Sequence, residues 1–131
     1  PVDADCGYIR FSGSTFNSTV TATDNGVATG TGAGGCTFNG DVHIIHNGTG
    51  TYFKLANTTG DIFNANLRVT NNSDHEVYLS TAGASQYKGN VILESTSSGG
   101  ISWSNSGGTS TLDSAKTISI GTAVFGPDPF P

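Results

Sequence analysis

Three histidines are the side chains best suited to acid–base or metal chemistry, because their ordinary pKa lies near neutrality. They are His43, His46 and His75, and none of them belongs to a Cys/His cluster with metal-ligand spacing. His43 stands between the apolar residues Val42 and Ile44, so in a strand it points outward. The other two fall among turn-forming polar residues. We therefore expect three solvent-exposed histidines rather than a metal pair or a catalytic base.

Acidic side chains could cut glycosidic bonds, since that reaction needs two carboxyl groups flanking the scissile bond. The candidates are scattered, and only two of them, Asp74 and Glu76, lie close together, in one polar turn; the candidates are Asp41, Asp61, Asp74, Glu76, Glu94 and Asp113. No Gly-x-Ser-x-Gly motif marks an activated serine. The sequence therefore predicts no catalytic residues and no enzymatic activity.

Calcium is the metal ion that the distribution of carboxylates suggests as a candidate ligand. Asp3, Asp5, Asp24, Asp41 and Asp61 stand among Gly and Asn, whose oxygens suit a hard cation. However, neither the spacing of an EF-hand nor a calcium-binding nonapeptide repeat is present. We predict no metal site and no cofactor, with calcium as the alternative.

Two cysteines, Cys6 and Cys36, are far apart and lack a Cys-x-x-Cys motif. In an exported chain such a pair favours a disulfide, which here would pin the N-terminal segment. Closing a loop of this length would stabilise the fold by about 3–4 kcal/mol. The alternative is two small buried thiols.

The charge balance restricts the partners of the chain. Five Lys and Arg stand against ten Asp and Glu, and the formal net charge is −5 at pH 7. Without a basic stripe to neutralise phosphates, we expect no nucleic-acid partner. No apolar run approaches the roughly 18 residues of a membrane span, so we expect no membrane insertion. The first residues lack the pattern of a signal peptide, and we expect an extracellular protein whose export signal was removed or lies outside these residues.

An internal repeat sets the positions of all these residues. A large apolar residue recurs at separations of 22, 25, 24 and 25 residues. Because one unit is too small to bury an apolar face alone, equivalent residues of successive units should stack on one another. The predicted core ladder consists of Phe16, Phe38, Phe63, Tyr87 and Leu112.

Each unit contains two short runs of alternating apolar residues. In the second unit Val42 and Ile44 follow the anchor Phe38, and a second run contains Phe53 and Leu55. Alternation is typical of strands with one inward face. We therefore predict an all-β fold, a β-solenoid with a repeat of about 24 residues and two short strands per coil. A β-sandwich or meander is the alternative, because alternation alone does not separate the two.

The repeat divides the chain into three parts. Residues 1–35 form an N-terminal segment with a degenerate, glycine-rich first repeat, which the disulfide would pin. Residues 36–122 form the β-repeat core. Residues 123–131 form a Pro-rich C-terminal tail, whose prolines lack the N–H donors needed to continue a ladder.

Two tyrosines are candidates for a ligand patch. Tyr52 and Tyr78 each stand next to an inward position, so both should point outward, and they occupy similar places in successive units. Aromatic rings stack on the flat faces of sugars, so this pair is our predicted contact for surface glycans. The alternative is ordinary cross-strand packing at the surface.

The motifs around the anchors resemble a known kind of repeat. They are Phe38-Asn39-Gly40-Asp41-Val42, Tyr87-Lys88-Gly89-Asn90-Val91 and Thr117-Ile118-Ser119-Ile120-Gly121. Over roughly residues 36–122 the chain resembles the tandem repeats of very large surface proteins exported by gliding and related Bacteroidetes-type bacteria. The resemblance implies secretion, surface adhesion or filament building, and no catalytic residue belongs to the motif.

Taken together, the sequence favours a non-catalytic extracellular structural or adhesive module, a subunit or segment of a surface filament or giant adhesin. Its expected partners are other copies of itself or flanking repeats. One alternative is a carbohydrate-binding adhesin domain that contacts surface glycans. Another is a fragment of a polysaccharide-degrading β-helix enzyme.

Overall fold

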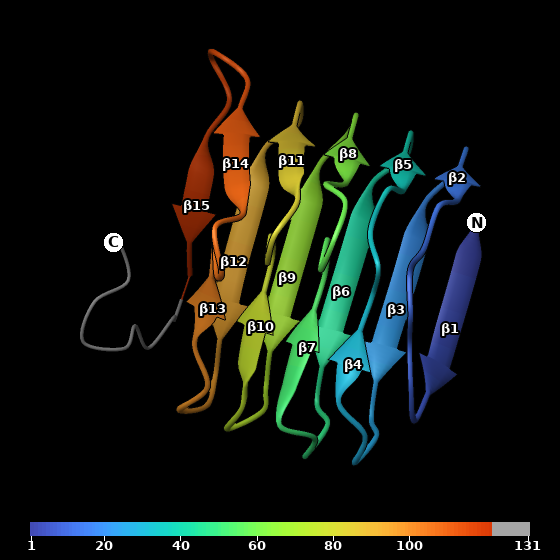
Figure 1. Ribbon diagram of the computed structural model, residues 1–131, viewed down its shortest axis with the longest axis vertical. Coiled ribbons are helices and arrows are strands. Elements are labelled where there is room, and N and C mark those ends of the chain that lie inside the picture. Colours follow the sequence, from blue (N-terminus) through green and yellow to red (C-terminus); the bar gives the residue numbers. More distant parts are fainter. Residues whose placement is uncertain (122–131) are drawn as a thin grey trace.

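The computed structural model describes residues 1–121, in which every regular element is a β-strand. The strands form three parallel sheets, in which equivalent strands of successive coils lie side by side, from β1 at the right of Figure 1 to β15 at the left. The six-stranded sheet contains, in order, β1 (Val2–Cys6), β3 (Val20–Asp24), β6 (Val42–His46), β9 (Leu67–Asn71), β12 (Val91–Ser95) and β15 (Ile118–Ile120).

The other two sheets consist of shorter strands. The five-stranded sheet contains β2 (Thr15–Phe16), β5 (Thr37–Phe38), β8 (Ile62–Phe63), β11 (Ala84–Tyr87) and β14 (Thr109–Leu112). The four-stranded sheet contains β4 (Gly30–Thr31), β7 (Tyr52–Lys54), β10 (Glu76–Tyr78) and β13 (Ile101–Ser102).

The chain visits the three sheets in turn, so each strand pairs with the equivalent strand one coil later. From β3 to β15, the first residues of the paired strands are 22, 25, 24 and 27 residues apart. The predicted β-solenoid is thus confirmed, and the sandwich alternative is excluded. Among residues 1–121 there is no helical segment with the length and apolar character of a membrane span.

Each coil has three strands instead of the two expected. The anchor and the alternating run after it looked like one strand, but the chain turns sharply between them. In two coils glycine is required at this corner: a Cβ on Gly40 would lie 2.5 Å from the carbonyl carbon of Ser18, the equivalent residue of the preceding coil. At the same corner, a Cβ on Gly89 would lie 2.2 Å from the carbonyl oxygen of Ala65. The anchor therefore belongs to the five-stranded sheet and the following run to the six-stranded sheet.

An aromatic ladder fills the interior beside the five-stranded sheet. Phe16 stacks on Phe38 with a centroid separation of 5.0 Å, and Phe38 stacks on Phe63 at 4.9 Å. Tyr87 continues the column 5.2 Å from Phe63. Leu112 is in register with Tyr87 and is half-buried. The structure therefore brings together all five anchors in the order of the coils.

Further aromatic rings pack edge-on beside this ladder. At the first coil Phe11 lies edge-on to Phe16 and Phe38, with centroids 5.7 and 5.6 Å away. Its backbone passes so close to Gly32 that a Cβ there would lie 2.9 Å from the carbonyl oxygen of Phe11. At the last coil Trp103 lies edge-on to Tyr87 at 5.4 Å. The absence of a side chain at Gly32 in the first repeat thus leaves room for the backbone of Phe11, whose ring packs against the ladder.

The predicted disulfide between Cys6 and Cys36 is wrong, and both thiols are free. Cys6 ends β1 in the six-stranded sheet, is exposed, and directs its thiol to the carbonyl oxygen of Tyr8. Cys36 is buried just before β5 in the five-stranded sheet. The two cysteines therefore lie on different sides of the solenoid. The predicted segment 1–35 supplies β1 to β4, and the predicted tail 123–131 lies outside the described residues.

Replacing Phe38 by alanine is expected to lower the free energy of unfolding by about 3–5 kcal/mol, because the ring is buried and has a stacked neighbour on each face. Phe16→Ala is the matched control, with a smaller expected loss because Phe16 is half-buried and has one stacked neighbour. Urea unfolding followed by circular dichroism measures both losses. Equal losses would contradict the ladder as a main source of stability.

Candidate functional site

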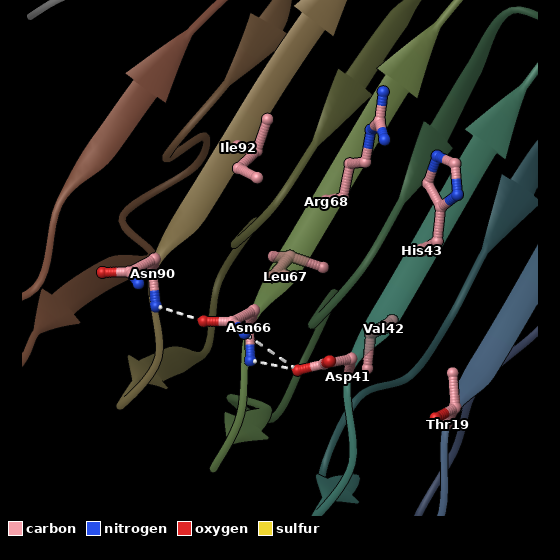
Figure 2. A pocket seen from close by; sticks show the side chains of 9 residues that line it. All are labelled: Thr19, Asp41, Val42, His43, Asn66, Leu67, Arg68, Asn90 and Ile92. Atoms are coloured by element: carbon pink, nitrogen blue, oxygen red, sulfur yellow. Dashed lines mark hydrogen bonds between the residues drawn. The ribbon is translucent and has the colours of Figure 1, made fainter.

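A hollow of about 350 Å³ lies on the outer face of the six-stranded sheet, where its strands begin. Figure 2 shows that its lining comes from several consecutive coils. One row of residues stands immediately before β3, β6, β9 and β12, and a second row, His43, Arg68 and Ile92, projects outward from β6, β9 and β12. The lining residues are Thr19, Asp41, Val42, His43, Asn66, Leu67, Arg68, Asn90 and Ile92.

Side-chain to backbone hydrogen bonds link the first row from coil to coil. Asn66 donates its backbone N–H to Asp41 Oδ1 at 3.0 Å and its side-chain amide to the same oxygen at 3.1 Å. The N–H of Asn90 donates to Asn66 Oδ1 at 3.0 Å, and that of Thr117 donates to Asn90 Oδ1 at 3.1 Å. Within residues 1–121, Asp41 Oδ2 and Asn90 Nδ2 make no hydrogen bond, so one acceptor and one donor remain for a ligand.

A connected polar network holds the second row in place. Arg68 binds Glu94 through two nitrogens, with Nε to Oε2 at 3.0 Å and Nη2 to Oε1 at 2.9 Å. These hydrogen bonds lower the pKa of Glu94, so its carboxylate is ionised at neutral pH. The Thr70 hydroxyl also donates to Glu94 Oε2, at 3.1 Å. Arg68 thus has its charge balanced, while its Nη1 makes no hydrogen bond within residues 1–121.

The same network determines the tautomer of His43. Its Nε2 lies 3.0 Å from Thr70 Oγ1. Because Thr70 gives its only hydroxyl proton to Glu94, His43 Nε2 must carry a proton and donate it to Thr70. Burial, followed by the charge of Arg68, lowers the pKa of His43, so the ring is neutral near pH 7. Nδ1 is therefore a hydrogen-bond acceptor. His43 points outward as expected but is half-buried rather than fully exposed.

His46 is fully buried, so the prediction of an exposed side chain is wrong. Its Nδ1 lies 3.0 Å from Oδ2 of Asp24, which is also buried. Burial lowers the pKa of His46 despite the opposing influence of Asp24, and Nε2 has no partner within residues 1–121. The pair belongs to an interior polar column in register across four coils, Asp24, His46, Asn71 and Ser95. The alternation Val42, Ile44, His46 was the sequence signal for an inward side chain.

A second interior polar group lies at the start of the five-stranded sheet. The Cys36 N–H donates to Asp61 Oδ1 at 2.8 Å, and the Asp61 N–H donates to Ser85 Oγ at 3.2 Å. Asp61 is fully buried, and its Oδ2 has no partner in the described part of the chain. Burial raises the pKa of Asp61 to about 6 and also raises the pKa of the Cys36 thiol. These residues stand two positions before their anchors, so alternation places them inside.

Tyr52 and Tyr78 are neighbours at the surface, but their places in the two coils differ. Tyr52 is in register with Glu76, and Tyr78 with Lys54. The two rings are 5.9 Å apart and inclined at 72°. Lys54 Nζ lies over both, 4.2 Å from the centroid of Tyr52 and 5.4 Å from that of Tyr78. Burial and the nearby carboxylate of Glu76 raise the pKa of Tyr78 to about 12. The patch is therefore a cation–π cluster and not a flat platform.

The carboxylates considered for calcium are dispersed over the solenoid. Asp24 and Asp61 are buried in different interior columns, whereas Asp3, Asp5 and Asp41 are exposed. Within residues 1–121 no group of three or more His, Cys, Asp and Glu side chains is placed to hold a metal ion.

Comparison of the chain with models of known protein families, with curated proteins and with solved structures gives no match.

Replacing Asp61 by asparagine is expected to change the pH dependence of stability. The folded-state pKa of about 6 lies above the ordinary value of 3.8, so ionisation favours the unfolded chain as the pH rises through this interval. Between pH values of about 4 and 7, the free energy of unfolding of the native chain should therefore fall by about 3 kcal/mol relative to that of the variant. Urea unfolding across this range measures the difference.

The exposed carboxylate Asp113 provides the control for this measurement. Asp113→Asn removes one negative charge without touching the interior, so it separates the effect of losing a surface charge from that of losing the buried carboxyl. A constant difference between native chain and Asp61→Asn across the same range would contradict a buried carboxyl with a raised pKa.

Proposed function

We propose that this chain is a non-catalytic extracellular structural and adhesive module, a segment or subunit of a surface filament or a giant adhesin. The observation that supports this role best is the continuity of side-chain ladders across successive coils. Such ladders join each coil to the next in addition to the backbone hydrogen bonds, and both kinds of contact resist separation of the coils in a rod under tension. The resemblance of residues 36–122 to tandem repeats of large bacterial surface proteins is a second line of support.

Asparagine ladders at two corners of the solenoid illustrate these links. At one corner Asn39 donates to Asn17 Oδ1 at 2.8 Å, and Asn64 donates to Asn39 Oδ1 at 2.7 Å. At another corner Asn47 donates to Asn25 and Asn72 donates to Asn47, both at 2.8 Å. Exposed amides in such rows resist separation of the coils without adding charge. These asparagine rows suit a structural rod, in which side chains stabilise the contact between neighbouring coils and have no catalytic role.

The two edges of the six-stranded sheet support stacking of further coils. Within residues 1–121, β1 and β15 each pair with one neighbouring strand only. Ile118 and Ile120 are 40% and 41% exposed, although their partners Val91 and Leu93 in β12 are buried. A further strand on β15 would bury both isoleucines and satisfy its free backbone groups. The proposed source of that strand is a flanking repeat or a second copy of this chain.

Antibodies raised against the purified chain test the extracellular location in the source cells. Intact cells, or the medium around them, should be labelled without permeabilisation. Immunoblotting of the same material gives the mass of the native polypeptide and distinguishes a segment of a giant adhesin from a small subunit. Labelling that requires permeabilisation would refute the proposal. A cytoplasmic marker protein, labelled only after permeabilisation, is the control.

The double variant Ile118→Lys/Ile120→Lys is expected to abolish self-association of the chain at rising concentration, because it would bury two charges in the junction. Ser119→Lys is the matched control: Ser119 pairs with Ile92, on the outer face, so its charge would stay in solvent. Sedimentation velocity measures association, and negative-stain microscopy shows fibres. A native chain that stays monomeric, or equal effects of the two substitutions, would contradict assembly through this edge.

A second candidate function is that of a carbohydrate-binding adhesin domain. The specific observation in its favour is the hollow of Figure 2, whose unsatisfied donors and acceptors lie beside an apolar side chain, Ile92. The tyrosine pair is the less suitable contact, because the rings are inclined to each other and the Lys54 ammonium group lies over one face of each.

A further inference from the structure

We propose that the hollow on the outer face of the six-stranded sheet binds a neutral, hydroxyl-rich glycan chain that lies along the stack of coils. This inference deepens the adhesive part of the proposed function and rests on it. It assigns the binding to His43, Arg68, Asp41 and Asn90 instead of the tyrosine pair.

The shape of the hollow fits an extended polymer. Its lining residues come from the coils of β3, β6, β9 and β12, so the hollow crosses four successive coils along the stacking direction (Figure 2). Parallel strands are about 4.8 Å apart, so His43, Arg68 and Ile92, which are in register, follow one another at that interval along the hollow. The three side chains differ, so an extended ligand meets an acceptor, a donor and an apolar contact in turn, and a chain of linked sugar rings can satisfy all three.

The available hydrogen-bonding groups are two acceptors on the coil of β6 and two donors on the coils of β9 and β12. His43 Nδ1 is an acceptor because Nε2 carries the ring proton, and Asp41 Oδ2 is a second acceptor. Arg68 Nη1 and Asn90 Nδ2 are donors that make no hydrogen bond within residues 1–121. A hydroxyl group can donate and accept at the same time. Vicinal hydroxyls of a sugar therefore satisfy such a mixed set, whereas a purely anionic or purely cationic ligand satisfies half of it.

The charge of the hollow favours a neutral ligand. The guanidinium group of Arg68 is paired with Glu94, with Nη2 and Oε2 separated by 2.8 Å. His43 contributes no positive charge in its neutral form, and Asp41 adds a negative charge at the rim. The local balance is therefore negative, so a chain of uronic acids or phosphodiesters would be repelled. Ile92 offers an apolar contact for the C–H face of a sugar ring.

The binding groups are already held in position before a ligand arrives. Arg68 is fixed by hydrogen bonds from two of its nitrogens to Glu94, and His43 is fixed by Thr70. Asp41 and Asn90 are members of the ladder that crosses the coils. Binding therefore costs little side-chain entropy, which is the main requirement for useful affinity on a shallow surface.

Two-dimensional ¹H–¹⁵N NMR titration of the full chain tests the proposal. The probes are neutral oligosaccharides of β-linked glucose, mannose and N-acetylglucosamine, with oligogalacturonate as the anionic comparison. At least one neutral probe should give saturable shifts of the amides around His43, Arg68 and Asn90, and oligogalacturonate should bind at least tenfold more weakly. Absence of saturable shifts with every neutral probe at millimolar concentration, or tighter binding of oligogalacturonate, would overturn the proposal.

Three variants locate the binding. His43→Phe keeps a ring but removes the acceptor, and it should weaken binding at least tenfold. Ile45→Ala is the matched control on the same strand and the same outer face, outside the lining of the hollow, and should change binding less than twofold. Tyr52→Ala should also leave binding unchanged. The amide spectrum of each variant shows whether it is folded.

The opposite pattern, with loss of binding in Tyr52→Ala and none in His43→Phe, would assign the glycan to the tyrosine pair and refute the site in the hollow. Failure of glycan binding leaves the surface-labelling result untouched. The structural role and the glycan site can therefore be rejected independently of each other.

Discussion

The stacking of like on like at the spacing of parallel strands is the constraint on which the whole structure depends. Each coil lies about 4.8 Å from the next, so a side chain at a given position rests on its equivalent in the neighbouring coil. Aromatic rings form a column because Phe38 has Phe16 on one face and Phe63 on the other. Asparagine amides form rows for the same reason. The fold and the candidate surfaces are consequences of this single repeat distance.

The repeat and its anchors could be predicted from the sequence because large apolar residues return at nearly constant intervals. The third strand of each coil could not. Phe38 and Val42 are four residues apart, and a corner that takes up an even number of positions leaves the inward–outward alternation unchanged on both sides of it. The corner is therefore invisible to periodicity, and only the close approach of the backbone at Gly40 distinguishes it from a continuous strand.

The candidate sites were predicted less well, for two physical reasons. His46 and Asp61 occupy inward positions of an alternating pattern, but their polarity argued for solvent, and the interior hydrogen bonds that compensate come from other coils. Tyr52 and Tyr78 were matched by counting residues, yet Phe53 pairs with Val77, which places one tyrosine before and the other after the paired position. The hollow could not be predicted from the sequence because its walls come from separate coils, whose residues are more than 20 positions apart in the chain.

The interior column from Asp24 to Ser95 has a consequence for how the chain finds its order. In a stack of similar coils, a strand that pairs with the wrong coil still places ring on ring and amide on amide. The aromatic and asparagine ladders therefore discriminate poorly against such mispairing. The column differs in every coil, and a shift would separate His46 from Asp24 and leave a carboxylate in the interior without its partner. These non-identical residues therefore specify which coil pairs with which, although the coils are otherwise similar.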